Sequence, residues 1–318
     1  MASNRGAHAY LLTGPPQIGK RTLARRTAAT LVCTAPLAER PCGACRACDQ
    51  VERDAHPDVL MLQPDEGHVR IRVRQIRAFE HDVALKPYVA ERKVAIVLGV
   101  DRIEIEAANA LLKTLEEPPE DTLMILTASD PAQVVPTIAS RCQEVALRSV
   151  PASEIERALA ERGVDPERAT LLARLAGGRP GWALSALTDG AQLETRKKQL
   201  DQLEELIESE PAARLAASQG YTDSAAGRAG ALASLTAWQT WWRDALLVRE
   251  GCEELVVNVD RLEALRRVSA SPAACGRAVR RLQDAREQLD ANANVRLAVE
   301  SVLLDLPGKK QGHVAGIR

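Results

Sequence analysis

The sequence contains few aromatic residues and no long apolar run. Only 3% of its 318 residues are Phe, Trp or Tyr, whereas 46% are hydrophobic, so Leu, Ala, Val and Ile must fill most of the core. No apolar run approaches the roughly 18 residues of a membrane-spanning helix. The N-terminal stretch also lacks the apolar segment of a secretory signal. We therefore expect a cytoplasmic protein.

The chain also lacks an excess of charge of either sign. It has 42 Lys and Arg residues and 43 Asp and Glu residues, which gives a formal net charge of −1 at pH 7. This balance argues against a module that binds DNA by itself, because such modules rely on a basic surface to neutralise phosphates. The five histidines show neither metal-site nor triad spacing, and we place His56 on the surface.

Strands and helices alternate over the first half of the chain. Short apolar runs predict buried strands, and the stretches between them have helical periodicity. Such alternation indicates a parallel sheet that helices cover on both faces. The predicted strands are 9–14, 93–100, 122–129 and 142–150, and the predicted helices are 21–31 and 106–117. The arginine-rich stretch 70–77 predicts a basic strand before Gln75 and a helix after it.

From about Pro151 onward the sequence predicts helices only. The first of them has Ser153 as its expected N-cap and ends at Gly163. Trp238, Trp241 and Trp242 have helical spacing, which favours a bundle core over a base-stacking platform. Glycines and Pro272 separate the later helices. The predicted division is an α/β domain over 1–148 with a cysteine-rich module at 33–48, a small helical domain over 149–190, a larger all-helical domain over 191–308 and a flexible tail over 309–318.

The stretch from Leu11 to Thr22, LLTGPPQIGKRT, nearly matches a phosphate-binding loop. Gly14, Gly19 and Lys20 fit the pattern, but Arg21 stands where a Ser or Thr should bind magnesium, and Thr22 comes one position late. A strand, a glycine-rich turn and a helix in this order can present backbone N–H groups to a phosphate. The alternative is an ordinary strand-to-helix turn.

Asp101 follows an apolar strand, which is where a second nucleotide-binding element is expected. An ATPase of this kind places a Glu next to that Asp to polarise the attacking water, but here the next residue is Arg102. Glu104 and Glu106 lie nearby, shifted into the next turn. Without a placed base, hydrolysis should be very slow. The alternative is that Asp101 caps the helix that follows.

Four cysteines lie within sixteen residues, with the spacing Cys-x8-Cys-x2-Cys-x2-Cys. Four thiolates at such spacing can close a tetrahedral zinc site, and Pro41 and Gly43 favour the tight knuckle that it needs. An iron–sulfur cluster is the chemical rival. An all-cysteine ligand set indicates a closed, structural site. The predicted ligands are Cys33, Cys42, Cys45 and Cys48.

Arg141 belongs to the tripeptide Ser-Arg-Cys, in the turn before the fourth predicted strand. In an oligomeric ATPase an arginine in such a turn can stabilise charge on a neighbouring subunit's nucleotide. A surface salt bridge is the alternative.

Six segments of the chain occur in a recognisable order. They are HAYLLTGPPQIGKRTLA, the cysteine group, LKPYVAERKVAIVLGVDRI, AANALLKTLEEPP, PTIASRC and NANVRLAVESVLLDLP. Together they resemble the clamp-loader branch of the AAA+ ATPases, and the resemblance covers most of the chain. The most specific parts are NALLKTLEEPP and SRC.

The resemblance implies a RecA-like AAA+ domain with a parallel sheet, then a helical lid and an all-α collar that holds a ring together. The motor subunits of this branch have Gly-Lys-Thr in the loop and Asp-Glu after the strand that corresponds to 93–100. This chain has Arg21 and Arg102 at those places, so it resembles the stator subunit, which hydrolyses no ATP. The alternative is a self-sufficient ATPase of the gamma/tau type.

By the same resemblance the chain would assemble with gamma/tau and delta subunits in the clamp loader of bacterial DNA polymerase III, a DNA-directed DNA polymerase. The complex loads the sliding clamp onto primed DNA during replication. Arg141 would act as an arginine finger in trans, and the zinc site would be structural. ATP or ADP would bind weakly, if at all, at a degenerate site formed by Gly14, Gly19, Lys20, Arg21, Thr22 and Asp101.

One departure from the family concerns the start of the chain. Family members usually carry some thirty residues before the equivalent of His8, and these help to enclose the adenine. Only seven residues precede His8 here. If this short start is native, we expect a nucleotide pocket that is open on the base side.

Overall fold

The computed structural model describes residues 7–65, 68 and 70–308, and the chain divides into two compact units. The first comprises residues 1–150 together with 179–181, and the second comprises 151–178 and 182–318. The separation of the second unit into a lid and a collar stays a prediction. The predictions for the N-terminal start and for the flexible tail at 309–318 fall on residues 1–6 and 309–318, outside the described residues.

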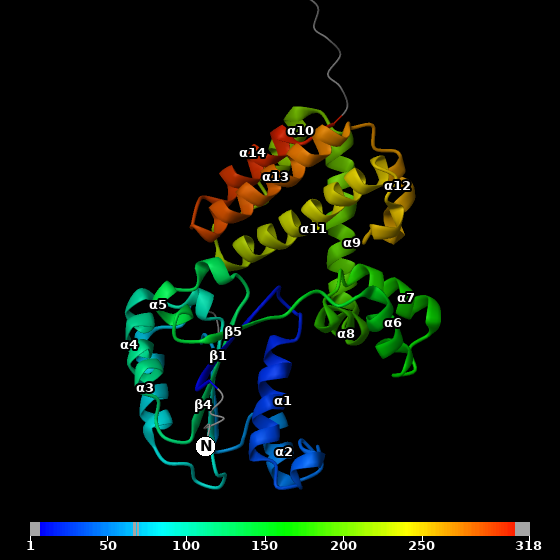
Figure 1. Ribbon diagram of the computed structural model, residues 1–318. Coiled ribbons are helices and arrows are strands. Elements are labelled where there is room, and N and C mark those ends of the chain that lie inside the picture. The colour runs from blue at the N-terminus through cyan, green and yellow to red at the C-terminus, as the bar shows by residue number, and fades with distance from the viewer. Residues whose placement is uncertain (1–6, 66–67, 69, 309–318) are drawn as a thin grey trace, which may run out of the picture. The chain divides into compact units, whose positions relative to one another are not determined.

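The first unit is built on a five-stranded parallel sheet with the strand order β2-β3-β4-β1-β5 (Figure 1). The four predicted strands are confirmed, and β2 was missed. Its four residues, VLML, form too short an apolar run to distinguish a strand from a piece of helix by pattern alone. The strands are β1 Ala9–Thr13, β2 Val59–Leu62, β3 Lys93–Leu98, β4 Thr122–Ala128 and β5 Gln143–Ala146.

Helices cover both faces of this sheet, as the alternating pattern predicts (Figure 1). On one face α1 (Lys20–Val32) and α2 (Arg46–Glu52) pack through small residues against apolar side chains of the inner strands. On the other face α3 (Val73–Ala84), α4 (Ile105–Glu116) and α5 (Pro136–Ala139) form a separate apolar cluster with the sheet. The result is a three-layer α/β/α domain, as the sequence pattern predicts.

The arginine-rich stretch 70–77 is helical sooner than predicted. Helix α3 begins at Val73, and the backbone N–H of Arg72 donates to Oε1 of Gln75 at 3.0 Å, as in a capping box. Only Ile71 makes a strand-like bridge, to Ile103. The helix is favoured because Ile76 and two further apolar side chains fall on one buried face.

The second unit is entirely helical in its described residues, as predicted. Its helices end near the predicted breaks, but α6 begins at Ala152 after Pro151, so Ser153 lies in the first turn and is not the N-cap. The α-helices are α6 Ala152–Ala160, α7 Pro166–Leu175, α8 Pro180–Thr188, α9 Gly190–Glu208, α10 Pro211–Ser218, α11 Ala225–Arg249, α12 Leu262–Arg266, α13 Pro272–Asp290 and α14 Val295–Asp305. Short 3₁₀ turns occur at η1 Leu37–Glu39, η2 Val100–Arg102, η3 Pro131–Gln133, η4 Glu253–Leu255 and η5 Val259–Arg261. Among the described helices, none is long and apolar enough to span a bilayer.

The three clustered tryptophans form the centre of this helical unit, which confirms the prediction of a bundle core. Trp238, Trp241 and Trp242 are at most 2% exposed. The rings of Trp241 and Trp242 meet edge to face, with centroids 5.1 Å apart, an arrangement that aromatic pairs prefer. In a chain with so few aromatics, these side chains supply much of the bulk of the bundle.

A buried arginine joins two helix ends in the second unit. The Arg214 guanidinium donates to the carbonyl oxygens of Leu206 at 2.8 Å and Ile207 at 3.0 Å, in the last turn of α9. It also donates to Leu306 at 2.7 Å and Leu303 at 3.3 Å, at the end of α14. The carbonyls of a last helical turn have no partner within the helix, so one side chain caps both helices.

Arg214→Ala should lower the free energy of unfolding of this unit by about 2–3 kcal/mol, because the capped carbonyls lose a charged donor. Urea unfolding followed by tryptophan fluorescence measures this, because all four tryptophans belong to the second unit. Arg277 is an exposed residue of α13, so Arg277→Ala is the matched control and should change the midpoint little. Equal effects of the two substitutions would contradict the capping role.

Candidate functional site

The predicted phosphate loop connects β1 to α1 and has the backbone that such a loop requires. Gly14 has φ 137° and Gly19, the N-cap of α1, has φ 111°. A Cβ atom on Gly14 would lie only 2.5 Å from the carbonyl oxygen of Leu147, so a side chain is excluded there by contact as well as by conformation. The first turn of α1 therefore directs its free N–H groups into the loop.

Lys20 fills this loop with its ammonium group. Its Nζ donates to the carbonyl oxygens of Gly14 at 2.5 Å and Pro15 at 2.9 Å, and reaches Oγ of Ser129 at 3.4 Å. Burial lowers the pKa of Lys20, the charge of Asp101 opposes that effect, and the charge of Arg102 adds to it. An anion bound in the loop would compensate this desolvated cation.

Asp101 lies in η2, directly after β3, and its carboxylate reaches across to the end of β4. Its Oδ2 accepts from the backbone N–H groups of Ser129 at 3.0 Å and Asp130 at 3.3 Å. Its Oδ1 is buried and has no hydrogen-bond partner among the described residues. The N-cap of α4 is Glu104, so the alternative role of Asp101 as a helix cap is wrong.

Arg21 and Thr22, the other predicted members of the nucleotide site, lie on the exposed part of α1. The Arg21 guanidinium pairs with Asp54, just beyond α2, at 3.0 Å, and Arg25 binds the other oxygen of the same carboxylate at 3.0 Å. The structure thus brings Gly14, Gly19, Lys20 and Asp101 together at the carboxyl ends of the inner strands. Arg21 instead pairs with Asp54, just beyond α2. The sequence pattern gave no signal for the partner, Asp54.

The four predicted cysteine ligands converge between the end of α1 and the start of α2. Their sulfur atoms all lie within 4.8 Å of one another, with Cys33 3.6 Å from Cys42 and 3.9 Å from Cys45. A tetrahedral site with Zn–S bonds near 2.3 Å needs sulfur atoms about 3.8 Å apart. The cluster therefore fits a metal ion held by four thiolates.

Backbone N–H groups point at these sulfurs, as a thiolate site needs. The N–H of Cys45 lies 3.3 Å from Sγ of Cys42, and the N–H of Cys48 lies 3.4 Å from Sγ of Cys45. Such donors, that of Thr34 foremost, lower the pKa of Cys45 to about 5. Gly43, with φ 70°, makes the tight turn between the first two knuckle cysteines.

His56 is buried, so its predicted surface position is wrong. It is 4% exposed, and its Nδ1 accepts from the backbone N–H of Asp58 at 3.1 Å. Burial lowers the pKa of His56. The carboxylate of Asp58 in turn accepts from three consecutive N–H groups of the loop before β3, at 2.5–2.8 Å. This histidine is not a member of the cysteine cluster; it helps to order the chain that leads into β2.

Arg141 lies in the short turn after α5 and is held by Glu116 and Thr137, with a longer contact from its Nη1 to Oγ of Ser140 at 3.4 Å. Its Nη2 lies 2.5 Å from Oε1 of Glu116, at the end of α4, and its Nη1 donates to the carbonyl oxygen of Thr137 at 2.9 Å. The side chain remains 34% exposed. The surface ion pair that the sequence left as an alternative is present, and the exposed part of the guanidinium remains free to meet another molecule.

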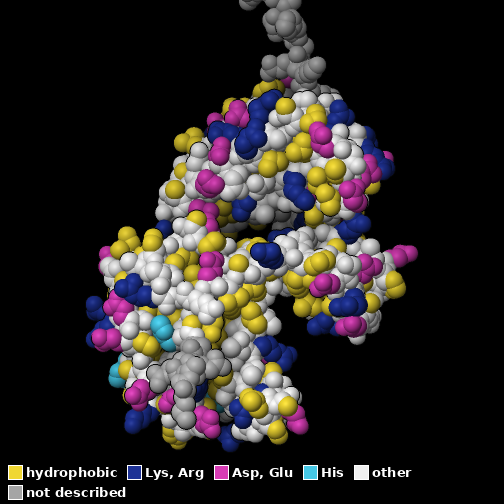
Figure 2. Space-filling view, viewed as in Figure 1, with side chains coloured by type: hydrophobic (Ala, Val, Ile, Leu, Met, Phe, Trp, Pro, Cys, Tyr) yellow, Lys and Arg dark blue, Asp and Glu magenta, His cyan; other side chains and the backbone are white. Residues whose placement is uncertain are grey.

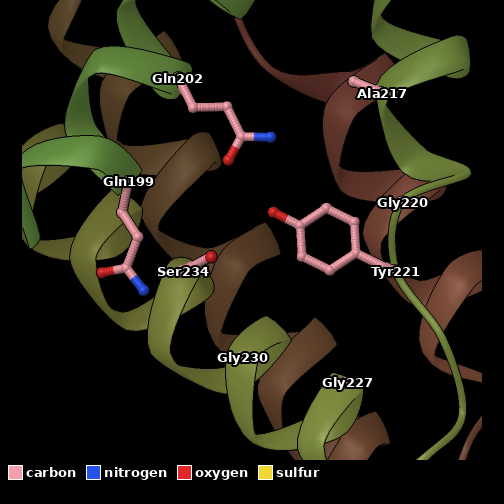
Figure 3. Close-up of a pocket in the computed structure, with 8 residues that line it drawn as sticks. All are labelled: Gln199, Gln202, Ala217, Gly220, Tyr221, Gly227, Gly230 and Ser234. Atoms are coloured by element: carbon pink, nitrogen blue, oxygen red, sulfur yellow. The ribbon is translucent and has the colours of Figure 1, made fainter. Parts of the chain in front are cut away.

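A polar cavity of about 360 Å³ lies in the second unit (Figure 3). The hydroxyl of Tyr221 points into the space between Gln202 and Ser234, and small residues form the remaining wall. No charged side chain lines it, so it offers no counter-charge to a phosphate.

On the face seen in Figure 2, acidic and basic side chains are interspersed, in agreement with the near-zero net charge.

Comparison with known proteins relates this chain to subunits of DNA polymerase III. The family described as DNA polymerase III, delta subunit, matches residues 1–151. DNA polymerase III subunit delta' of Pseudomonas aeruginosa is 37% identical over 210 residues, which are 65% of this chain and 63% of that protein. Subunit delta' of Bacillus subtilis is 28% identical over 95% of this chain and 92% of its own length. This chain is thus similar to DNA polymerase III subunit delta', and it spans less than two thirds of the Pseudomonas aeruginosa relative's length.

Relatives named DNA polymerase III subunit tau match over a smaller share of their length. Subunit tau of Escherichia coli is 35% identical over 58% of this chain but only 29% of its own. The solved structure of a gamma-subunit-related protein from Thermotoga maritima is 20% identical, with a TM-score of 0.45 over 94% of each chain. The matches to the delta' subunits confirm the resemblance that the sequence motifs indicate.

The contact of Gly14 with Leu147 yields a test of the loop geometry. Gly14→Ala and Gly19→Ala both impose a positive φ on alanine, at a cost of about 1–3 kcal/mol. Only Gly14→Ala adds a clash, because nothing lies within 4 Å of a Cβ at Gly19. In calorimetry, Gly14→Ala should lower the unfolding enthalpy and the midpoint temperature more than Gly19→Ala does. A greater loss for Gly19→Ala would contradict this geometry.

Proposed function

We propose that this delta' homologue is the stator subunit of a bacterial clamp loader. It assembles with gamma/tau and delta subunits and helps to load the sliding clamp onto primed DNA in the cytoplasm. It hydrolyses no ATP by itself, and it supplies Arg141 to the nucleotide site of an adjacent motor subunit. The similarity to relatives named DNA polymerase III subunit delta', together with the matching sequence segments, supports this assignment.

The observation that carries the proposal is the pair of arginines in the loop region. Where a motor holds magnesium with a hydroxyl, Arg21 instead pairs with Asp54. Where a motor holds a catalytic carboxylate, Arg102 adds positive charge near Lys20. A phosphate could still bind to the loop N–H groups and Lys20, but neither magnesium nor an attacking water would be positioned. We therefore propose a degenerate ATP or ADP site.

The cysteine cluster is proposed as a structural zinc site. Its four sulfurs complete a tetrahedral set, which leaves no open position for a substrate. Bound zinc would supply the cross-link that joins the end of α1 to α2. The ion pairs of Arg21 and Arg25 with Asp54 then fasten the same module to the outer side of α1.

Protein prepared without chelator should contain one zinc per chain by elemental analysis. Cys45→Ser should lower the zinc content well below one, because it removes both a ligand and the sulfur that receives the N–H of Cys48. Cys252→Ser, outside the cluster, is the matched control and should retain full zinc. Absence of zinc from the wild type, or visible absorption from an iron–sulfur cluster, would overturn the assignment.

Arg141→Ala should leave the subunit folded and assembled but lower ATP turnover by the reconstituted complex. An arginine finger acting in trans is worth about 10³–10⁵ in rate at the site that it serves. The complex should thus lose nearly all of the ATP turnover that this one site contributes. The change should appear in kcat more than in KM. Arg92→Ala removes the same charge from another exposed position of the first unit and is the control.

Two results would contradict the proposed function. One is unchanged ATP turnover and clamp loading by the Arg141→Ala complex. The other is hydrolysis by the isolated chain near 1 per second, within the usual enzyme range, that Lys20→Ala abolishes. The second result would favour a self-sufficient ATPase of the gamma/tau type.

A further inference from the structure

Glu116 is the acidic partner of the exposed arginine that the proposed function uses. It lies in the last turn of α4, 25 residues before Arg141, and its Oε1 is 2.5 Å from the arginine Nη2. The neighbouring Glu117 makes no ion pair among the described residues, although it has the same charge and is also exposed. The contact is therefore specific to one of two adjacent glutamates.

The two held nitrogens fix the plane of the guanidinium. Nη1 donates to the backbone carbonyl of Thr137, 2.9 Å away, while Nη2 binds Glu116. A free arginine side chain has many rotamers, and its planar group has five N–H donors. Two anchors on the terminal nitrogens remove much of that freedom and leave the other N–H groups available to an incoming anion.

We infer that Glu116 is a positioning residue for Arg141. This inference rests on the proposed arginine-finger function. The carboxylate holds the guanidinium, in the free subunit, in one orientation on the surface of the first unit, so that a neighbouring subunit's nucleotide meets an ordered arginine. Glu116 itself touches no substrate; it acts only through the side chain that it holds.

The direction of the effect follows from preorganisation. A donor that is ordered before the transition state forms costs no ordering during the reaction, whereas misplacement of a reacting group by about 1 Å can cost up to 100-fold. Release of the arginine should therefore lower the rate at the served site. If the ion pair instead withheld the arginine, removal of Glu116 would raise the rate.

The test is a double-mutant cycle in the reconstituted complex. Glu116→Ala should lower turnover at the site that Arg141 serves by about tenfold, in kcat with little change in KM. Glu116→Gln keeps an acceptor oxygen at the same reach and should retain most of the activity. In an Arg141→Ala background, Glu116→Ala should cause no further loss, because there is no longer a side chain to position.

Glu117→Ala is the matched control and should leave turnover unchanged. Thermal unfolding of each variant subunit and assembly of each complex confirm that the comparison is made on folded protein. Wild-type or raised turnover by Glu116→Ala would overturn the inference, as would a loss that adds fully to that of Arg141→Ala. If Arg141→Ala alone has no effect, the finger proposal fails first, so the two failures are distinguishable.

Discussion

The first unit depends on the close approach of its sheet edge to the loop after β1. A Cβ atom at Gly14 would lie only 2.5 Å from the carbonyl oxygen of Leu147, and Lys20 donates to carbonyl oxygens of the same loop. These contacts place the N-terminus of α1, the end of β3 and the end of β4 around one desolvated ammonium group. The proposed phosphate site consists of that arrangement of backbone together with a single lysine.

In the proposed function, the arginines near this loop account for a phosphate-binding loop that does not catalyse hydrolysis. Arg21 pairs with Asp54, just beyond α2, and Arg102 lies near Lys20. Neither contact damages the loop itself, whose glycines and lysine keep their geometry. The third arginine, Arg141, is exposed and held by Glu116. In the proposed stator, Arg21 and Arg102 stand where a motor subunit has its magnesium-binding and catalytic side chains, and Arg141 faces the neighbouring subunit.

Much of this structure could be predicted because the decisive signals are local. The apolar run before Gly14 and the proline stop after α4 set the strands and helices, and the two-residue spacing of Cys42, Cys45 and Cys48 brought their sulfurs together. Strand β2 was missed because four residues carry too little periodicity. His56 was misplaced, and the partners Asp54 and Glu116 were not foreseen, because burial and ion pairing over 25 or more residues depend on the tertiary fold.

The most direct test of a retained but non-catalytic loop is nucleotide binding by the isolated subunit, measured by calorimetry with and without magnesium. Without a hydroxyl after Lys20, the loop should bind ATP or ADP weakly, with an affinity that magnesium hardly changes, and Lys20→Ala should abolish that binding. Tight binding that requires magnesium, accompanied by turnover, would contradict the account.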